Sequence, residues 1–523
     1  MNKKVNIIFG ICLSFISLIA SLVIHVFYTP FLLKSVGDAE YGIFSYALSI
    51  TSWITILSSA LTAAYIKYIN IAEKKDKEKG PSKFNGLLIT LFLIIDLIVC
   101  VVFFIFFVLF KTNTIVIGSF SGQERELFNL LFLISGTQLI ISIPMNVFSL
   151  YITFKSRFIY LKFISLLTTV SPYLISIPFL LSGAGVISFL LINSVVLVVS
   201  FLLNAGFSIF VLKQKFSFKF KSLISDGMLR SILFFTFAML FIEIVDKLNA
   251  TSDKIILGSF VSAESVTYYQ LGLSFTEFLT TLSLAISTVF IPTINSLHAS
   301  GQKEKINTLF LDTSFVQMLL LFFVVGGFAS CGREFITLWV GQDKSICYWI
   351  ALSLLLISIA PLSQNVANEV QKAYNLYLFR IKVNFISVLI NVSISIVLIF
   401  ILGKDYAILA CLLGTLSTSL VSKWIILSFY NSKKIGLPMN KYWINILKFL
   451  AIAVSGFGFA FFVNFVFSKY VSQSKLILFL VTGFAYCLIY VPFCLVAFKK
   501  ENAKILNVLK GIFKKQSEGF TNE

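Results

Sequence analysis

The sequence predicts an all-α protein that crosses a membrane about fourteen times. Of its 523 residues, 58% are hydrophobic and only 12% are charged, which is about half the charged share of an ordinary globular chain. The apolar residues form long runs, and a transmembrane helix needs about 20 of them. The formal net charge is nevertheless +19, an excess that membrane proteins collect on one side of the bilayer. This composition excludes a soluble globular protein.

Short polar breaks divide the apolar runs into fourteen candidate helices. They cover residues 5–33, 41–70, 85–110, 126–152, 159–181, 186–212, 231–256, 265–292, 306–330, 346–371, 381–402, 406–429, 443–467 and 475–498. The first run follows two lysines and lacks a small-residue cleavage site, so we expect a retained helix and not a signal peptide. The seven cysteines show no paired spacing, and we therefore expect no metal and no cofactor.

The basic residues predict the orientation of these helices. With the N-terminus in the cytoplasm, 32 of the 42 Lys and Arg residues fall on the cytoplasmic side and 8 on the other. The remaining two, Lys247 and Lys254, lie at membrane depth. Because cytoplasmic loops are enriched in Lys and Arg, this split predicts a multi-pass protein of the cytoplasmic membrane with both termini inside. The positive charge is a topology signal, and we expect no nucleic-acid partner.

A weak internal repeat indicates two six-helix lobes. Ala39-Glu40 recurs as Ala263-Glu264, and Ile69-Asn70 recurs as Ile294-Asn295 at nearly the same spacing. Repeated lobes are typical of transporters. The predicted organisation is an N-lobe over 1–212, a cytoplasmic linker over 213–230, a C-lobe over 231–430, two further helices within 431–498 and a basic tail over 499–523. The tail has the composition of a segment that lies against anionic lipid.

Catalysis is the less favoured class of function. The sequence contains no nucleophile elbow, no P-loop and no HExxH motif, and only two histidines. The alternatives in other classes are a membrane glycosyltransferase or polysaccharide polymerase and a non-transport scaffold. A membrane glycosyltransferase or polymerase typically carries its active site on a sizeable extracytoplasmic loop. The predicted helices follow one another too closely to leave room for such a loop. We therefore expect a protein that is not an enzyme.

The seventh predicted helix contains the strongest candidate site. Glu243, Asp246, Lys247, Asp253 and Lys254 recur at helical spacing along one face. A charge at the centre of a bilayer costs about 2.5–3.5 kcal/mol even on lenient scales, so this stripe should face a polar cavity. The alternative is a structural i,i+4 pair between Glu243 and Lys247, with Asp253 and Lys254 at the interface.

Other helices carry further polar candidates. His25 lies on a serine-rich face of the first helix, where the serines alternatively allow close helix packing. Glu277 lies on the eighth helix and Asn368 on the tenth, each on a polar face. We expect these faces and that of the seventh helix to line a water-filled cavity between the lobes. The candidates for coupling to H⁺ or Na⁺ are Asp96, Glu243, Asp246 and Asp253.

Three stretches of the sequence resemble one transporter family. The first is residues 28–68, with Pro30, Leu33, Gly37, Glu40, Tyr41 and Gly42; the second is Asp253 to Gly258 followed by Tyr268 or Tyr269; the third is Trp339-Val340-Gly341. The chain is similar to the Wzx-like polysaccharide transporters of the multidrug/oligosaccharidyl-lipid/polysaccharide exporter superfamily. The resemblance extends over essentially the whole chain, although its motifs are loose.

The resemblance implies a flippase that moves a polyprenyl-pyrophosphate-linked oligosaccharide to the outer leaflet by alternating access of two lobes. It implies lipid-linked oligosaccharide, membrane lipid and other polysaccharide-assembly proteins as partners, and places Asp253 at the acidic position of helix seven. Such flippases are usually described with several arginines in the cavity, whereas the arginines of this chain lie near helix ends. As phosphate partners we therefore nominate four lysines: Lys34, Lys67, Lys247 and Lys254. The alternatives within the same fold are a cation-coupled multidrug exporter and a lipid II flippase.

Overall fold

The computed structural model describes residues 3–77, 79–114, 120–219, 227–471, 473–499 and 501. All regular secondary structure in these ranges is helical, and 14 helical segments are long and apolar enough to cross a membrane. This confirms the predicted fold class, and each predicted span corresponds to one of these segments. The predicted tail 499–523 lies outside the described residues except for positions 499 and 501.

The chain forms two compact units. Unit 1 contains residues 1–270 and 388–411, and unit 2 contains residues 271–387 and 412–523. Three helices, α10, α15 and α16, are divided between the units. The predicted boundaries of the two lobes remain a prediction.

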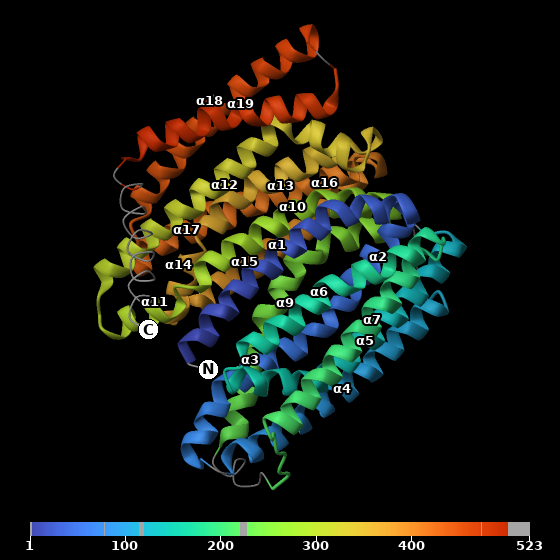
Figure 1. The fold of residues 1–523 in the computed structure, drawn as a ribbon, viewed down its shortest axis with the longest axis vertical. Coiled ribbons are helices and arrows are strands. Elements are labelled where there is room, and N and C mark those ends of the chain that lie inside the picture. The colour runs from blue at the N-terminus through green and yellow to red at the C-terminus, as the bar shows by residue number, and fades with distance from the viewer. Residues whose placement is uncertain are drawn as a thin grey trace. The chain divides into compact units, whose positions relative to one another are not determined.

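Unit 1 is a bundle of long helices joined by short 3₁₀ and π-helical segments (Figure 1). Its elements are α1 (Lys3–Val36), α2 (Asp38–Thr51), the 3₁₀ turn η1 (Ser52–Ile54), α3 (Thr55–Lys75), α4 (Gly80–Lys111), α5 (Gly122–Phe154), α6 (Phe158–Leu181), α7 (Gly185–Gly206), the π-helical η2 (Phe207–Val211), α9 (Met228–Phe260), the start of α10 (Ala263–Thr288), the second half of α15 (Tyr377–Leu402), η4 (Lys404–Tyr406) and the start of α16 (Ala407–Ser419).

Unit 2 holds the remaining parts of α10, α15 and α16 and the C-terminal helices. Its further elements are α11 (Ile291–Ala299), α12 (Lys303–Val340), η3 (Gln342–Lys344), α13 (Ile346–Ser363), α14 (Asn365–Ala373), the π-helical η5 (Leu420–Ile426), α17 (Leu427–Tyr430), the π-helical η6 (Asn431–Ile435), α18 (Met439–Tyr470) and α19 (Lys475–Ala497). Helices α18 and α19 run side by side (Figure 1) and both pack on α12.

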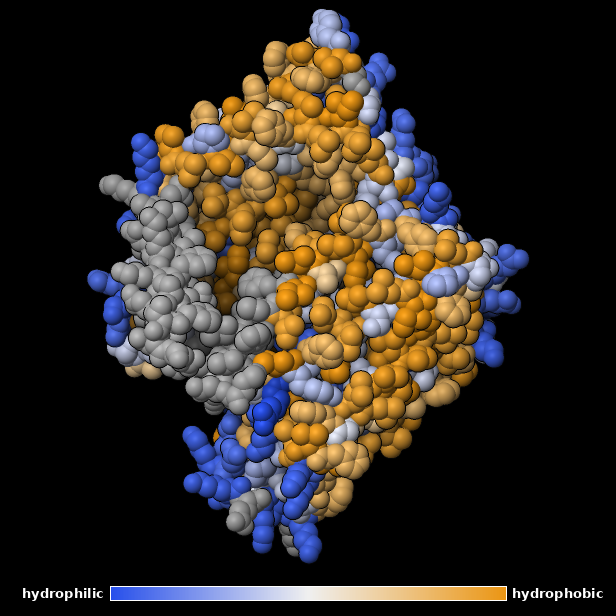
Figure 2. All heavy atoms as spheres, viewed as in Figure 1, coloured by the Kyte–Doolittle hydropathy of each residue, from blue (hydrophilic) through white to orange (hydrophobic). Residues whose placement is uncertain are grey.

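The outer surface of the helices is apolar. On α4, one face buries Phe92, Val99 and Phe103, while the opposite face exposes large side chains such as Leu97 and Val101. Figure 2 shows hydrophobic side chains over most of the visible helix surface and hydrophilic ones gathered at helix ends. Exposed apolar side chains over the length of many helices are the arrangement that a bilayer requires. The protein is a multi-pass membrane protein.

Three residues of the first family-like stretch, Gly37, Glu40 and Gly42, have structural roles in unit 1. Gly37 joins α1 to α2 with a positive φ of 83°, which favours glycine. The Glu40 carboxylate accepts a hydrogen bond from the backbone N–H of Val186 in the first turn of α7, where an anionic group is stabilised by the helix dipole. A Cβ on Gly42 would lie 1.9 Å from the carbonyl oxygen of Ala263, so α2 and α10 meet in backbone contact.

Unit 2 satisfies the backbone groups that its broken helices release. Pro361 lies inside α13 and has no N–H to donate to the carbonyl of Ile357. The indole Nε1 of Trp424 in η5 donates to that oxygen at 2.9 Å. Neighbouring helices commonly satisfy such groups inside a membrane. The C-terminal helices are fixed by similar bonds, because the Tyr486 hydroxyl of α19 donates to the Phe322 carbonyl of α12 at 2.8 Å.

Candidate functional site

The charged residues in the middle of α9 form a cluster with α3. Glu243 interacts with Asp246 and Lys247 of its own helix and hydrogen-bonds Ser59 of α3. Glu243 and Lys247 are partly buried, whereas Asp246 is exposed. The stripe predicted from helical spacing therefore exists. It combines the predicted i,i+4 pair with a polar contact to a neighbouring helix, and its place in a transport cavity stays a prediction.

Asp253 is the most deeply buried of the predicted acids. Its side chain is only 8% exposed, and its carboxylate accepts hydrogen bonds from the hydroxyl of Tyr269 on α10 and from Nδ2 of Asn391 on α15, the latter at 3.3 Å. The Oδ1 of Asn391 in turn accepts a bond from Ser395 at 3.4 Å. All four residues belong to unit 1. A buried carboxylate is tolerated when such donors satisfy it.

This set, which we call the Asp253 cluster (Asp253, Tyr269, Asn391 and Ser395), has the chemistry of a site for a small hard cation or a proton. It offers carboxylate, amide and hydroxyl oxygens, which are the ligands that hard cations prefer. Sequence reasoning identified Asp253 and Tyr269 but not Asn391 or Ser395. The missed signal is an asparagine, Asn391, in the middle of the apolar half of α15, since polar groups at membrane depth are costly unless partnered.

Lys254 is held by neutral partners next to the Asp253 cluster. Its Nζ donates to Oε1 of Gln270 on α10 at 2.8 Å, and the hydroxyl of Ser45 on α2 reaches the same oxygen at 3.4 Å. Lys254 thus places a cation between α2, α9 and α10 within unit 1.

The other predicted residues of unit 1 lie apart from this centre. His25 and Lys34 are exposed on α1, and Lys67 is exposed on α3, with its Nζ 4.2 Å from the ring centroid of Phe235. Asp96 lies on α4, and its buried Oδ1 has no hydrogen-bond partner among the described residues. The structure does not bring Asp96 into contact with the acids of α9.

The predicted residues of unit 2 have different surroundings. Glu277 is exposed on α10. Asn368 of α14 is partly buried and donates to Oδ1 of Asn365 at 3.4 Å. The assignment of Glu277 and Asn368 to a substrate cavity stays a prediction.

The polar face predicted for the tenth helix belongs largely to the core of unit 2. Gln364 and Gln371 are 4% and 0% exposed. Gln371 donates to Oδ1 of Asn431 at 2.6 Å, and Gln364 donates to the hydroxyl of Ser428 at 3.0 Å. These amides are buried, and they bond to Ser428 of α17 and Asn431 of the π-helical η6. We call Gln364, Gln371, Ser428 and Asn431 the unit 2 amide network.

The described residues include no group of three or more His, Cys, Asp or Glu side chains that could hold a metal ion. The cysteines in the described part whose side chains are placed are free thiols. The chemistry available at the Asp253 cluster is therefore that of a carboxylate with amide, phenol and hydroxyl neighbours.

Comparison with known proteins gives a family and a fold. The family described as polysaccharide biosynthesis protein matches residues 5–298. Among solved structures, the lipid II flippase MurJ in an inward closed conformation has a TM-score of 0.68 at 17% identity and covers 94% of this chain and 99% of its own.

Two further structures have the same fold. A substituted form of the MATE transporter VcmN of Vibrio cholerae has a TM-score of 0.56 at 14% identity, with 83% of this chain and 99% of that chain covered. A MOP superfamily transporter of Pyrococcus furiosus has a TM-score of 0.56 at 14% identity, with 82% and 95% covered. No curated protein matches the sequence. The architecture is thus that of flippases and exporters.

Proposed function

The chain belongs to the polysaccharide biosynthesis protein family, and on that premise we propose that it is a flippase for polyprenyl-pyrophosphate-linked oligosaccharide repeat units. It moves these units across the cytoplasmic membrane by alternating access, for the assembly of a cell-surface polysaccharide. Both termini lie in the cytoplasm, and other polysaccharide-assembly proteins supply and consume the cargo.

The observation that carries this proposal is the charged helix α9. A hydrated sugar head must cross about 30 Å of hydrocarbon, and a polar route lets the head cross while the prenyl tail stays in lipid. Within its membrane span α9 carries Glu243, Asp246, Lys247, Asp253 and Lys254, held by polar partners from three neighbouring helices. Charges are retained at membrane depth where they have a function.

In this proposal the Asp253 cluster binds the coupling ion. Its oxygens suit Na⁺, and its carboxylate suits H⁺. Lys254, Lys247, Lys67 and Lys34 contribute positive charge for the pyrophosphate.

The decisive experiment is reconstitution of the full chain in liposomes with a fluorescent polyprenyl-pyrophosphate oligosaccharide. The fraction of cargo that an external sugar-modifying enzyme reaches reports movement between leaflets, under an imposed Na⁺ or H⁺ gradient. Protein-dependent movement that follows one of the gradients supports the proposal. Absence of movement, with a lipid II control that does move, would assign the chain to lipid II.

The lipid II alternative has one specific observation in its favour. The similarity to the lipid II flippase MurJ extends over 94% of this chain, compared with 83% for VcmN. At 17% identity this similarity establishes the fold alone. Supplying both lipids to the same liposomes therefore distinguishes the two cargoes directly.

Accessibility labelling tests whether the α9 stripe lines the route. Single cysteines at Glu243, Asp246 and Asp253 should react with a small aqueous thiol reagent, whereas cysteines at lipid-facing Leu97 and Val101 should not. Neutral replacements of Lys247 or Lys254 should reduce surface polysaccharide at normal protein levels. Inert cysteines at all three acidic positions would make the stripe a structural feature.

A further inference from the structure

The first turns of α9 present two opposite faces. Met228 and Ile232 are 5% and 0% exposed and pack into a core shared with α3 and α4. On the other face, Arg230 is exposed and is followed at spacings of four, three and four residues by Phe234, Phe237 and Phe241. These phenylalanines are 77%, 70% and 44% exposed. A single stripe of the helix therefore runs from a cation onto three aromatic rings.

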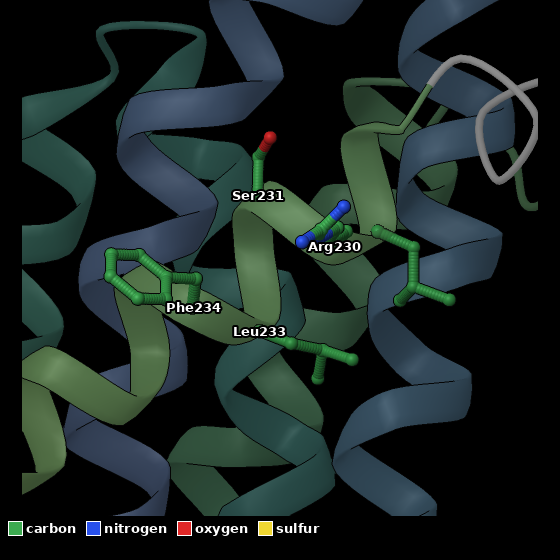
Figure 3. Close-up of a pocket in the computed structure, with 5 residues that line it drawn as sticks. Arg230, Ser231, Leu233 and Phe234 are labelled. Carbon is green, nitrogen blue, oxygen red and sulfur yellow. The ribbon is translucent and has the colours of Figure 1, made fainter.

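A cavity of about 700 Å³ lies at the cationic end of this stripe. The residues that line it are Leu229, Arg230, Ser231, Leu233 and Phe234. Figure 3 shows the Arg230 side chain on one side of the helix turn and the Phe234 ring on the other. The cavity thus combines a guanidinium and a hydroxyl with an apolar wall.

The turn that carries Arg230 is fixed against α3. The carbonyl of Ser231 accepts a bond from the hydroxyl of Tyr68 at 3.2 Å, and the Ser231 hydroxyl donates to the carbonyl of Gly227 at 3.1 Å. One turn later, Phe235 packs under Nζ of Lys67. These contacts fix the backbone of the turn that carries Arg230.

We propose that this cavity binds one anionic phospholipid of the surrounding membrane. The guanidinium of Arg230 matches a phosphodiester through two parallel hydrogen bonds, and one fatty chain lies along Leu233, Phe234 and Phe237. From Arg230 to Phe241 the helix rises about 16 Å, which is comparable to the length of such a chain. A single guanidinium suits the single charge of a phosphodiester, whereas a pyrophosphate would call for more than one cation in the cavity.

The charge around the cavity favours an anionic head group. The helix ends and linker at this end of unit 1 are rich in lysine and arginine: Lys74, Lys75, Lys79, Lys83, Lys155, Arg157, Lys213 and Lys215. Among them, Lys83 lies 3.6 Å from Asp76 and Lys155 lies 3.9 Å from Glu73. Basic residues near a membrane surface attract anionic lipid at about 1 kcal/mol each, while Arg230 supplies the specific contact.

Native mass spectrometry of the full-length protein in detergent tests the proposal. We expect one phosphatidylglycerol molecule to bind in preference to phosphatidylcholine. Arg230→Gln should weaken that binding by about tenfold or more, because a charge-assisted bond is lost. Lys83→Gln is the control at the same basic end, and it should change binding by less than about twofold, since Lys83 is already paired with Asp76.

Two further variants distinguish a built site from general attraction to lipid. Arg230→Lys keeps the charge but loses the paired geometry, and should bind with an intermediate affinity. Phe234→Ser should weaken binding of long-chain but not short-chain phosphatidylglycerol. Each variant is first checked for a monodisperse, folded sample by size exclusion and thermal unfolding.

Three results would overturn the proposal. One is equal weakening by Arg230→Gln and Lys83→Gln, which would indicate attraction by the basic end as a whole. Another is unchanged binding in Arg230→Gln. The third is displacement of phosphatidylglycerol by undecaprenyl pyrophosphate at a much lower concentration, which would make the cavity a cargo site. None of these results depends on transport, so failure here is distinguishable from failure of the proposed function.

Discussion

The two units bury polar side chains in different ways. In unit 1, Asp253 is a carboxylate with a phenol and an amide as donors, and Lys254 rests on a neutral glutamine. In unit 2, the amide network bonds amides to amides and hydroxyls, and Gln371 and Asn431 are 0% and 1% exposed. Neutral groups that satisfy one another stabilise a fold. A charge that must be desolvated is harder to justify by stability alone. Unit 2 also buries a carboxylate, Glu334, against the amide of Asn464, so the comparison that bears on function is between the Asp253 cluster and the unit 2 amide network.

The strongest test of this contrast is Asp253→Asn. The variant preserves shape and hydrogen-bonding groups but removes the charge, so we expect transport in liposomes to fall about 10- to 100-fold. The unfolding temperature should change little. If transport persists at the wild-type rate and ion dependence, the Asp253 cluster is structural, like its counterpart in unit 2.

Gln371→Leu tests the unit 2 amide network, where we expect an effect on stability and not on transport. The substitution leaves Oδ1 of Asn431 without this donor in a fully buried place, so we expect a loss of about 1–3 kcal/mol of unfolding free energy. Transport per folded molecule should stay near the wild-type value. Asn368→Leu is the control, because Asn368 is only partly buried and should have a smaller effect. A transport defect in Gln371→Leu at full stability would contradict the assignment.

A similar loss is expected from Gly42→Ala in unit 1. The added methyl group would lie 1.9 Å from the carbonyl oxygen of Ala263, so α2 and α10 must separate. Overpacking of this kind costs about 1–3 kcal/mol. Gly206→Ala, at a helical position with open space around the added Cβ, is the control and should be neutral or slightly stabilising. Thermal unfolding in detergent compares the two.

The smallest effect should come from Glu40→Gln. Its carboxylate accepts the Val186 N–H at the start of α7, and an amide oxygen can replace the bond but not the charge. We therefore expect a loss of about 0.3–1 kcal/mol from the helix dipole alone. Glu40→Ala removes the bond as well and should cost more. Equal effects of the two substitutions would show that the dipole contributes nothing at this position.

Much of the fold could be predicted because membrane spans depend on local composition. Each of the fourteen apolar runs corresponds to one membrane-spanning helical segment. The segment α12 nevertheless extends to Val340, ten residues beyond the predicted end at 330. The predicted helix stopped at residue 330, just before Gly332 and Arg333, because a charge lowers the mean hydropathy. The helix continues because Glu334, 9% exposed, is satisfied by Nδ2 of Asn464 at 3.1 Å, a partner 130 residues away.

The candidate site was predictable only in part. Helical periodicity placed Glu243, Asp246 and Lys247 on one face, and they do interact. Periodicity also placed Gln364 and Gln371 on a polar face, and the structure turns that face into the core of unit 2. A helical pattern states which residues share a face but not whether the face meets water, lipid or another helix.

The sequence by itself determined the membrane class, the number of spans and the family, because these depend on hydropathy, charge and motifs that are local along the chain. The tertiary structure decided which polar side chains are bonded to each other: Asn391 reaches Asp253 across 138 residues, and Trp424 caps the carbonyl that Pro361 releases. Such partners are selected by packing in three dimensions, where an unsatisfied polar group in hydrocarbon costs several kcal/mol, and no local pattern encodes them.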